Sequence, residues 1–131
     1  MRWMRLVTSL LFAFLGAPAL ASQDLYTGHS LTGGSTEETI CIITNVNSKP
    51  IGVTAEILGS FDGSLVPGQL KVCPVPPATL APGHSCSTDL SNFNTDEIVY
   101  CHFTTSSSKV RASLLQVTSN FQTRVSLPAT K

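Results

Sequence analysis

The side chains whose type and spacing could carry chemistry in this chain are four cysteines, Cys41, Cys73, Cys86 and Cys101. A redox site needs two close cysteines, usually Cys-x-x-Cys, and no such spacing occurs. A zinc site could be assembled from Cys73, His84, Cys86, Cys101 and His102, because His84 and Cys86, and Cys101 and His102, lie close in sequence. The paired spacing of structural zinc sites is missing, however, and neighbours on a strand such as Cys101 and His102 point to opposite faces. We therefore expect neither a metal site nor a redox site.

Disulfide bonds are the remaining role for these cysteines, and four cysteines allow three pairings. Cys73 and Cys86 bracket a proline-rich connection with a turn at Pro82-Gly83, so the chain doubles back and can bring them within bridging distance. If Cys73 pairs with Cys86, Cys41 is left to pair with Cys101. This bridge would connect two inner strands across a core.

No catalytic constellation stands out among the other polar residues. None of the sequence patterns that surround an activated serine, a metalloprotease site or a phosphate-binding loop occurs. His84 lies in a predicted turn, where a solvated imidazole is ordinary. Neighbouring carboxylates occur at Glu37-Glu38 and at Asp96-Glu97, but adjacent side chains of an extended chain point apart. We expect a protein that is not an enzyme and that uses no cofactor.

The first 21 residues have the features of an export signal. Arg2 and Arg5 precede an apolar run over residues 6–17, and small residues at 19 and 21 suit a signal peptidase. The apolar run is shorter than the roughly 20 residues that a membrane-spanning helix needs. We therefore expect residues 1–21 to be removed and the rest to be exported to the periplasm or secreted, where cysteines form disulfides.

The charge pattern of residues 22–131 excludes one class of partner. Six basic and eight acidic residues remain there, a net charge of −2, and the basic residues are scattered singly. Nucleic-acid binding needs clustered Lys or Arg to neutralise several phosphates. We expect no nucleic-acid partner, and no membrane span either, because no later apolar stretch is long enough.

Apolar residues recur with a period of two, which predicts strands over residues 39–44, 51–57, 98–103, 110–117 and 121–127. The run over residues 39–44 is apolar and β-branched throughout, as in a strand covered on both faces. Within residues 110–117, Leu115 and Val117 reverse the preceding alternation. That reversal predicts a bulge or a strand that switches faces.

The segments between these strands predict the connections and the architecture. Residues 47–50 suit a hairpin between the first two strands, and residues 73–78, with three prolines, suit an edge or a loop. Residues 22–36 are a flexible N-terminal arm or an irregular first strand. Six to seven short strands with regular turn signals predict one all-β domain over residues 37–131, an antiparallel immunoglobulin-like β-sandwich.

Four motifs together resemble those of short exported proteobacterial proteins that consist of a single β-sandwich module and have no assigned activity. The motifs are Cys41-x-x-x-Asn45, Leu80-Ala81-Pro82-Gly83-His84-Ser85, Tyr100-Cys101-x-Phe103 and Lys109-Val110-Arg111-Ala112-Ser113-Leu114. The resemblance covers about residues 39–118. It implies a fold and a compartment, and it transfers no catalytic residue. Among these positions, Arg111 is the candidate surface contact, with a cross-strand pair as the alternative.

The leading hypothesis is a non-catalytic exported module that binds a protein or cell-envelope component through loops or a sheet edge. The alternative is a fimbrial or adhesive subunit in which residues 22–36 donate a strand to a neighbour. A third hypothesis is a small secreted enzyme or inhibitor, which a deep pocket that holds a histidine beside a carboxylate would support.

Overall fold

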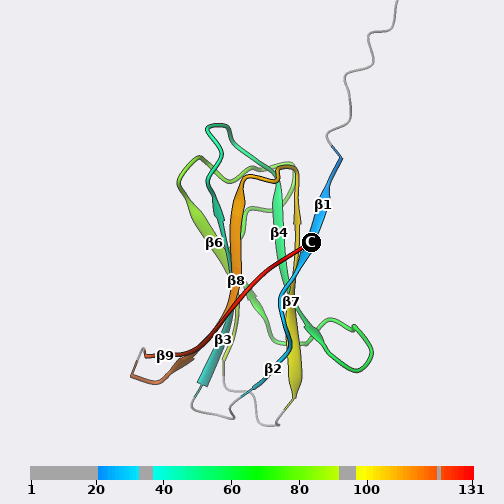
Figure 1. Cartoon of the computed structure of the whole chain (residues 1–131), viewed down its shortest axis with the longest axis vertical. Helices are drawn as coiled ribbons and strands as arrows, with labels where there is room; N and C mark the ends of the chain where they lie inside the picture. Colours follow the sequence, from blue (N-terminus) through cyan, green and yellow to red (C-terminus); the bar gives the residue numbers. More distant parts are fainter. Residues whose placement is uncertain (1–20, 33–36, 92–96, 121) are drawn as a thin grey trace, which may run out of the picture.

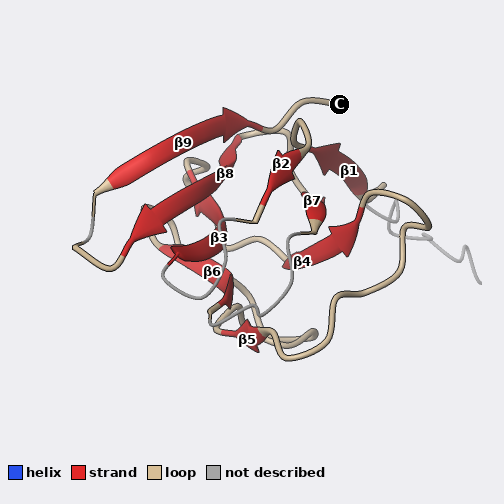
Figure 2. Cartoon of the chain, turned by 90° about the horizontal axis from the view of Figure 1, so that it is seen from below, coloured by secondary structure: helices blue, strands red, loops and turns tan. Residues whose placement is uncertain are grey.

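The computed structural model of the chain describes residues 21–32, 37–91, 97–120 and 122–131. Its strands form two antiparallel sheets that face one another (Figures 1 and 2). Sheet A has β7 (Ile98–Thr105) at its centre, with β4 (Val53–Gly59) on one side and β1 (Gln23–Tyr26) and β2 (Ser30–Leu31) on the other. Sheet B has the order β5 (Leu70–Lys71), β6 (Ser85–Leu90), β3 (Glu37–Asn45), β8 (Val110–Thr118) and β9 (Thr123–Pro128).

The core lies between the sheets because alternate residues of each strand point inward. Ile43 and Leu114 from sheet B meet Ile57, Val99 and Phe103 from sheet A, and all five are fully buried. Burying a side chain of this size stabilises a fold by roughly 1.5–3 kcal/mol. The alternation that the sequence displays therefore places the core correctly.

The four cysteines form two disulfides, and the pairs are those that the positions of the cysteines in the sequence favoured. Cys41 on β3 is joined to Cys101 on β7 across the core, with a Cα–Cα distance of 5.6 Å. Cys73 is joined to Cys86 on β6, with a Cα–Cα distance of 4.7 Å, and this bridge anchors the proline-rich segment to sheet B. The first bridge crosses between the sheets, whereas the second holds one edge.

The predicted hairpin over residues 47–50 is wrong. β3 pairs with β6 and β8, and β4 pairs with β7, so the link between β3 and β4 crosses from one sheet to the other. The crossing follows from burial, because the two strands press their apolar faces against each other instead of pairing edge to edge. Asn45 fixes the start of the link: its buried side-chain amide donates to the carbonyls of Lys49 and Leu80, both at 2.9 Å, and its Oδ1 accepts from the Asn47 N–H.

The described part of residues 22–36 takes the strand alternative. β1 and β2 both pair with β7, and Thr27 between them exchanges hydrogen bonds with the backbone of Cys101. At the other terminus Thr130 exchanges two backbone hydrogen bonds with Tyr26, which closes the flank between the sheets. The predicted signal segment falls almost wholly outside the described residues.

Nine strands are present in the described ranges, compared with the six or seven predicted. β2 and β5 have two residues each, and β6 was missed because its inward residues, Cys86, Thr88 and Leu90, include only one large apolar side chain. The described residues contain no helix. Accordingly, none of them forms a helix with the length and hydropathy that crossing a bilayer requires.

Candidate binding surfaces

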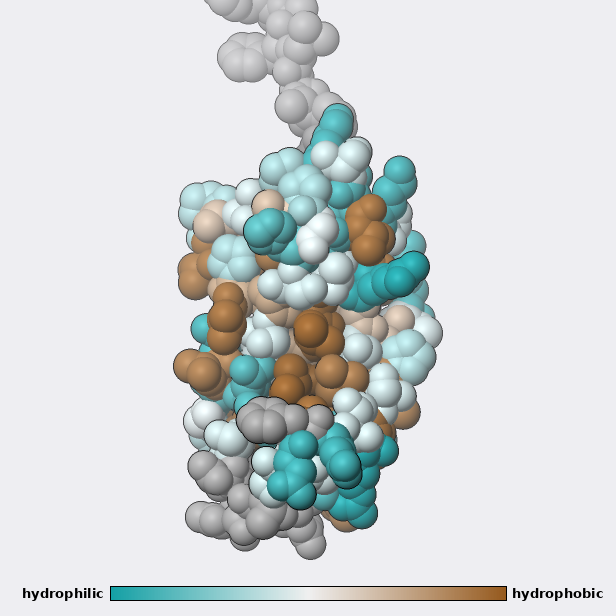
Figure 3. Space-filling view, turned by 90° about the vertical axis from the view of Figure 1, so that its left-hand side faces the viewer, coloured by the Kyte–Doolittle hydropathy of each residue, from teal (hydrophilic) through white to brown (hydrophobic). Residues whose placement is uncertain are grey.

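Apolar side chains gather on the side of sheet B that faces away from sheet A (Figure 3). Strand register places Ile40 between Asp89 and Leu115, and Leu70 lies on the far side of Asp89. We call this surface the outer apolar face and define it as Ile40, Ile42, Leu70, Val72, Leu115 and Val117. Leu70 and Val72 are 65% and 58% exposed, and the other four are half-buried.

This face explains two anomalies of the sequence. Ile40 and Ile42 are the outward residues of the strand whose composition predicts cover on both faces, yet within the described ranges only its inner face is covered. In β8, Leu114 and Gln116 point inward while Leu115 and Val117 point outward, so the strand does not switch faces. The predicted bulge in residues 110–117 is wrong as well, because β8 pairs with β3 in unbroken register. The pairing of β8 with β9 does shift between Gln116 and Val117, but the extra residue is Arg124 on β9.

Charged and polar groups surround the outer apolar face. Asp89 lies within it between Leu70 and Ile40, and its Oδ1 is buried with no hydrogen-bond partner among the described residues. Arg111 lies opposite Thr44 at one end and is exposed, beside an open depression of about 540 Å³ that Lys131 also lines. An apolar centre with a polar rim is the usual anatomy of a protein interface.

The free edge of β4 is a second surface. Gly52 and Ser60 hydrogen-bond on the β7 side, so the backbone groups of Val53, Ala55 and Ile57 face the other way. Two ends of this edge are occupied. Ile51 exchanges hydrogen bonds with Leu80, and Ile57 donates to Gln69 Oε1 at 2.9 Å and accepts from Gln69 Nε2 at 2.6 Å.

Between those occupied ends, the edge opens into a groove of about 150 Å³ beside Val53 and Ala55. Its far wall is residues 73–76, which the bridge between Cys73 and Cys86 holds in place. The Ala55 carbonyl accepts from Thr88 Oγ1 at 2.6 Å. No hydrogen bond of the described residues reaches the Val53 N–H, the Val53 carbonyl or the Ala55 N–H on this side.

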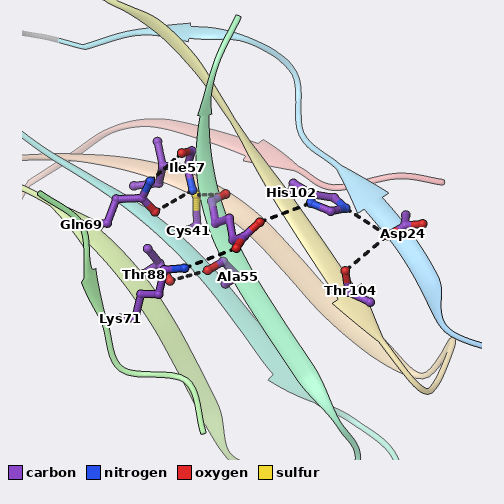
Figure 4. A network of polar contacts seen from close by, with 10 residues as sticks. Asp24, Cys41, Ala55, Ile57, Gln69, Lys71, Thr88, His102 and Thr104 are labelled. Atoms are coloured by element: carbon purple, nitrogen blue, oxygen red, sulfur yellow. Dashed lines mark hydrogen bonds and ion pairs between the residues drawn. The ribbon is translucent and has the colours of Figure 1, made fainter. Parts of the chain in front are cut away.

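A polar network crosses the outer side of sheet A and positions this edge (Figure 4). His102 on β7 lies 3.0 Å from Asp24 Oδ1 through Nε2 and 3.8 Å from Glu56 Oε2 through Nδ1. Lys71 Nζ then lies 3.3 Å from Glu56 Oε1, which links β4 to β5. Tyr26 stacks on His102 with ring centroids 4.8 Å apart. These contacts are cross-strand pairs that fix the register of β1, β7 and β4.

The other residues that the sequence singled out are dispersed. All four cysteines form disulfides, so they offer no thiolate, and the zinc candidates His84 and His102 lie in an exposed turn and on the outer side of sheet A. Among the described residues no three histidine, cysteine or acidic side chains converge as metal ligands would. His102 lies beside the carboxylates of Asp24 and Glu56 on the outer side of sheet A, and it lines neither the depression beside Arg111 nor the groove at Val53 and Ala55.

The sequence led us to expect binding through loops or a sheet edge, but it located neither the outer apolar face nor the free edge of β4. Their signals were present: an uninterrupted apolar run in β3, the reversed pattern in β8, and a proline-rich segment unable to complete a sheet edge. Comparison of the chain with known protein families, curated proteins and solved structures finds no match in any of the three.

Proposed function

We propose that this chain is a non-catalytic exported module that binds a protein partner through the outer apolar face of sheet B. The partner presents a complementary apolar surface and a basic side chain opposite Asp89. Two disulfides fit an oxidising compartment, and the proposal assigns the module to the periplasm or the extracellular medium.

The observation that carries the proposal is the exposed apolar content of a sheet side that faces water. Antiparallel sandwiches normally alternate apolar residues inward with polar residues outward. Here, six apolar side chains stand on the outward side, around a carboxylate oxygen that has no hydrogen-bond partner among the described residues. Contiguous apolar patches on a small soluble domain mark interaction sites. A basic side chain of the partner would interact favourably with the carboxylate of Asp89, which lies in the middle of this face.

The test compares residues 22–131 with the double variant Ile42→Thr/Leu115→Thr, and with Val46→Thr as the matched control. Val46 is 49% exposed and lies outside the outer apolar face. Each protein is used to capture partners from envelope fractions, and the captured partner is then purified and titrated directly. We expect the double variant to bind at least about tenfold more weakly, because each lost apolar contact contributes roughly 1 kcal/mol or more. The control and wild type should bind alike.

Equal affinities of wild type and double variant would overturn the proposal. Sedimentation of the purified protein tests a second copy as the occupant. If the wild type is a dimer and the double variant is a monomer, the outer apolar face binds a second copy of this chain and not a different protein. Asp89→Asn adds a separate check of charge, because it should weaken binding to a basic partner while leaving the melting temperature nearly unchanged.

The strand-donating subunit is the less favoured function. Donation would require β1 and β2 to leave β7, where Thr27 and the bonds between Tyr26 and Thr130 hold them. The immunoglobulin-like description is likewise part of the proposal. The bridge between β3 and β7 supports it, since immunoglobulin domains carry an inter-sheet disulfide, while the pairing of β8 with β3 is a departure, since the last strand of those domains joins the sheet of the second cysteine.

A further inference from the structure

We infer that the free edge of β4 at Val53 and Ala55 accepts an extended segment of another polypeptide as an added strand. This edge lies in sheet A, on a different sheet from the outer apolar face of sheet B. The inference is therefore independent of the proposed interface, and each can be tested without the other.

Three backbone groups form the hydrogen-bonding part of the site. The Val53 N–H, the Val53 carbonyl and the Ala55 N–H face away from β7 and lie in the gap between Ile51 and Ile57. An extended chain placed beside β4 offers carbonyls and N–H groups at the same spacing of about 3.4 Å per residue. Strand addition of this kind takes its affinity from main-chain hydrogen bonds and its specificity from alternate side chains.

The protein already binds an amide group at the next position of the same edge. The side-chain amide of Gln69 donates to the Ile57 carbonyl and accepts from the Ile57 N–H, so it pairs with Ile57 as a peptide group of a neighbouring strand would. Gln69 Nε2 also donates to the Val66 carbonyl at 2.6 Å, which holds the amide in that orientation. An incoming strand would continue this pairing toward the start of β4.

The groove specifies which side chains such a strand carries. A residue paired with Val53 would point its side chain inward, toward Cys73, Pro74 and Val75, and about 150 Å³ there suits a small apolar side chain such as valine. A residue paired with Thr54 would point outward to solvent. Val75 is 78% exposed, so an added strand would also cover an apolar side chain that the described chain leaves open. The expected ligand is an extended segment that alternates small apolar and polar residues.

The experiment titrates 15N-labelled protein, residues 22–131, with a capped pentapeptide of alternating threonine and valine. Its control is the same peptide with N-methylated valines, which cannot donate. We expect the amide signals of Val53 and Ala55 to shift and their hydrogen exchange to slow at millimolar peptide. The Ile57 amide, already paired with Gln69, should change little. The methylated peptide should bind at least about tenfold more weakly, because a lost hydrogen bond costs about that factor.

A pair of variants locates the site. Val75→Glu places a charge in the groove wall and should weaken peptide binding about tenfold, whereas Val46→Glu, at a similar solvent-facing valine outside the groove, should leave it unchanged. The inference is overturned if Val53 and Ala55 show no shift, if the methylated peptide binds equally, or if Val75→Glu has no effect. Concentration-dependent shifts at the two amides without peptide would overturn it too, in favour of a second copy. Ile42→Thr/Leu115→Thr should retain peptide binding, which separates this site from the proposed interface.

Discussion

Removing each disulfide separately measures what the bridge between the sheets and the bridge at the edge of sheet B each contribute to stability. The perturbations are the double variants Cys41→Ala/Cys101→Ala and Cys73→Ala/Cys86→Ala, compared with the oxidised wild type. The bridges differ in the length of chain that they close, with sequence separations of 60 and 13 residues. They also differ in burial, because Cys41 and Cys101 are both 0% exposed whereas Cys73 is only partly buried.

The magnitudes follow from the entropy that a crosslink removes from the unfolded chain. For a loop of 60 residues the chain-entropy relation gives about 4 kcal/mol, and for one of 13 residues about 3 kcal/mol. Loss of two buried sulfur atoms from the core adds roughly 1 kcal/mol to the first figure through the cavity left behind. A domain of this size is stable by only about 5–15 kcal/mol, so either loss consumes a large share of the margin.

Urea unfolding followed by circular dichroism is the appropriate assay, because the chain's only tryptophan is Trp3, within the predicted leader. We expect the midpoint to fall in both variants, and further for Cys41→Ala/Cys101→Ala. Its melting temperature should drop by roughly 20 °C, at about 4 °C per kcal/mol for a domain of this length. The dependence on urea should also steepen, because an uncrosslinked unfolded chain exposes more surface.

Mild reduction of the wild type shows which of the two disulfides is reduced first. Thiol labelling and mass spectrometry should find Cys73 and Cys86 free first, while Cys41 and Cys101 stay oxidised until the domain unfolds. A chelator should leave the melting curve unchanged. The reasoning fails if the central pair is labelled as early as the peripheral pair, or if oxidised and reduced protein melt at the same temperature.

Three further predictions concern single side chains. Gln69→Leu should destabilise the domain by roughly 1–3 kcal/mol in urea unfolding, because the N–H of Ile57 loses its partner, and an unchanged midpoint would contradict that role. Gly83→Ala should cost about 1 kcal/mol or more by the same assay, since φ is +75° there, and a neutral result would remove the argument from backbone strain. Hydrogen bonds from the Ser64 N–H and hydroxyl lower the pKa of Asp62, so an NMR titration should place it below the ordinary value of about 3.9, and Ser64→Ala should raise it. Because that pKa is lowered by folding, any stabilisation from Asp62 is present above pH 4 and is lost as the pH falls through the folded value.

The strands with clear alternation could be predicted from the sequence. The expected ranges 39–44, 98–103 and 110–117 lie within β3, β7 and β8, and 51–57 overlaps β4. Local chemistry was sufficient there, because β4 alternates in polarity, and the apolar, β-branched composition of residues 39–44 favours a strand without alternation. β6 was not predicted, because its inward residue Thr88 is polar. The hydroxyl of Thr88 donates to the Ala55 carbonyl on another strand, a contact that the local sequence does not show.

Pairing between strands could not be predicted, because it depends on contacts distant in sequence. Residues 47–50 have the composition of a hairpin, but Asn45 bonds to Leu80, 35 positions away, and commits the link to crossing between sheets. The same limit hid the groove at β4. A sequence does not show which backbone N–H groups are paired. The unpaired edge at Val53 can therefore be recognised only when the positions of the neighbouring segments are known.

The apolar composition of the outer face of sheet B has two physical explanations that the residues themselves separate. Isoleucine and valine favour strands through β-branching, so Ile40, Ile42 and Val117 could serve the strand alone. Leucine has no branch at Cβ, yet Leu115 stands beside Ile40 in the same row, and Leu70 follows across Asp89. The residues of the outer apolar face are therefore all apolar, but they do not all have a high strand propensity. That surface contributes little to the core, which supports the proposal that it contacts a partner.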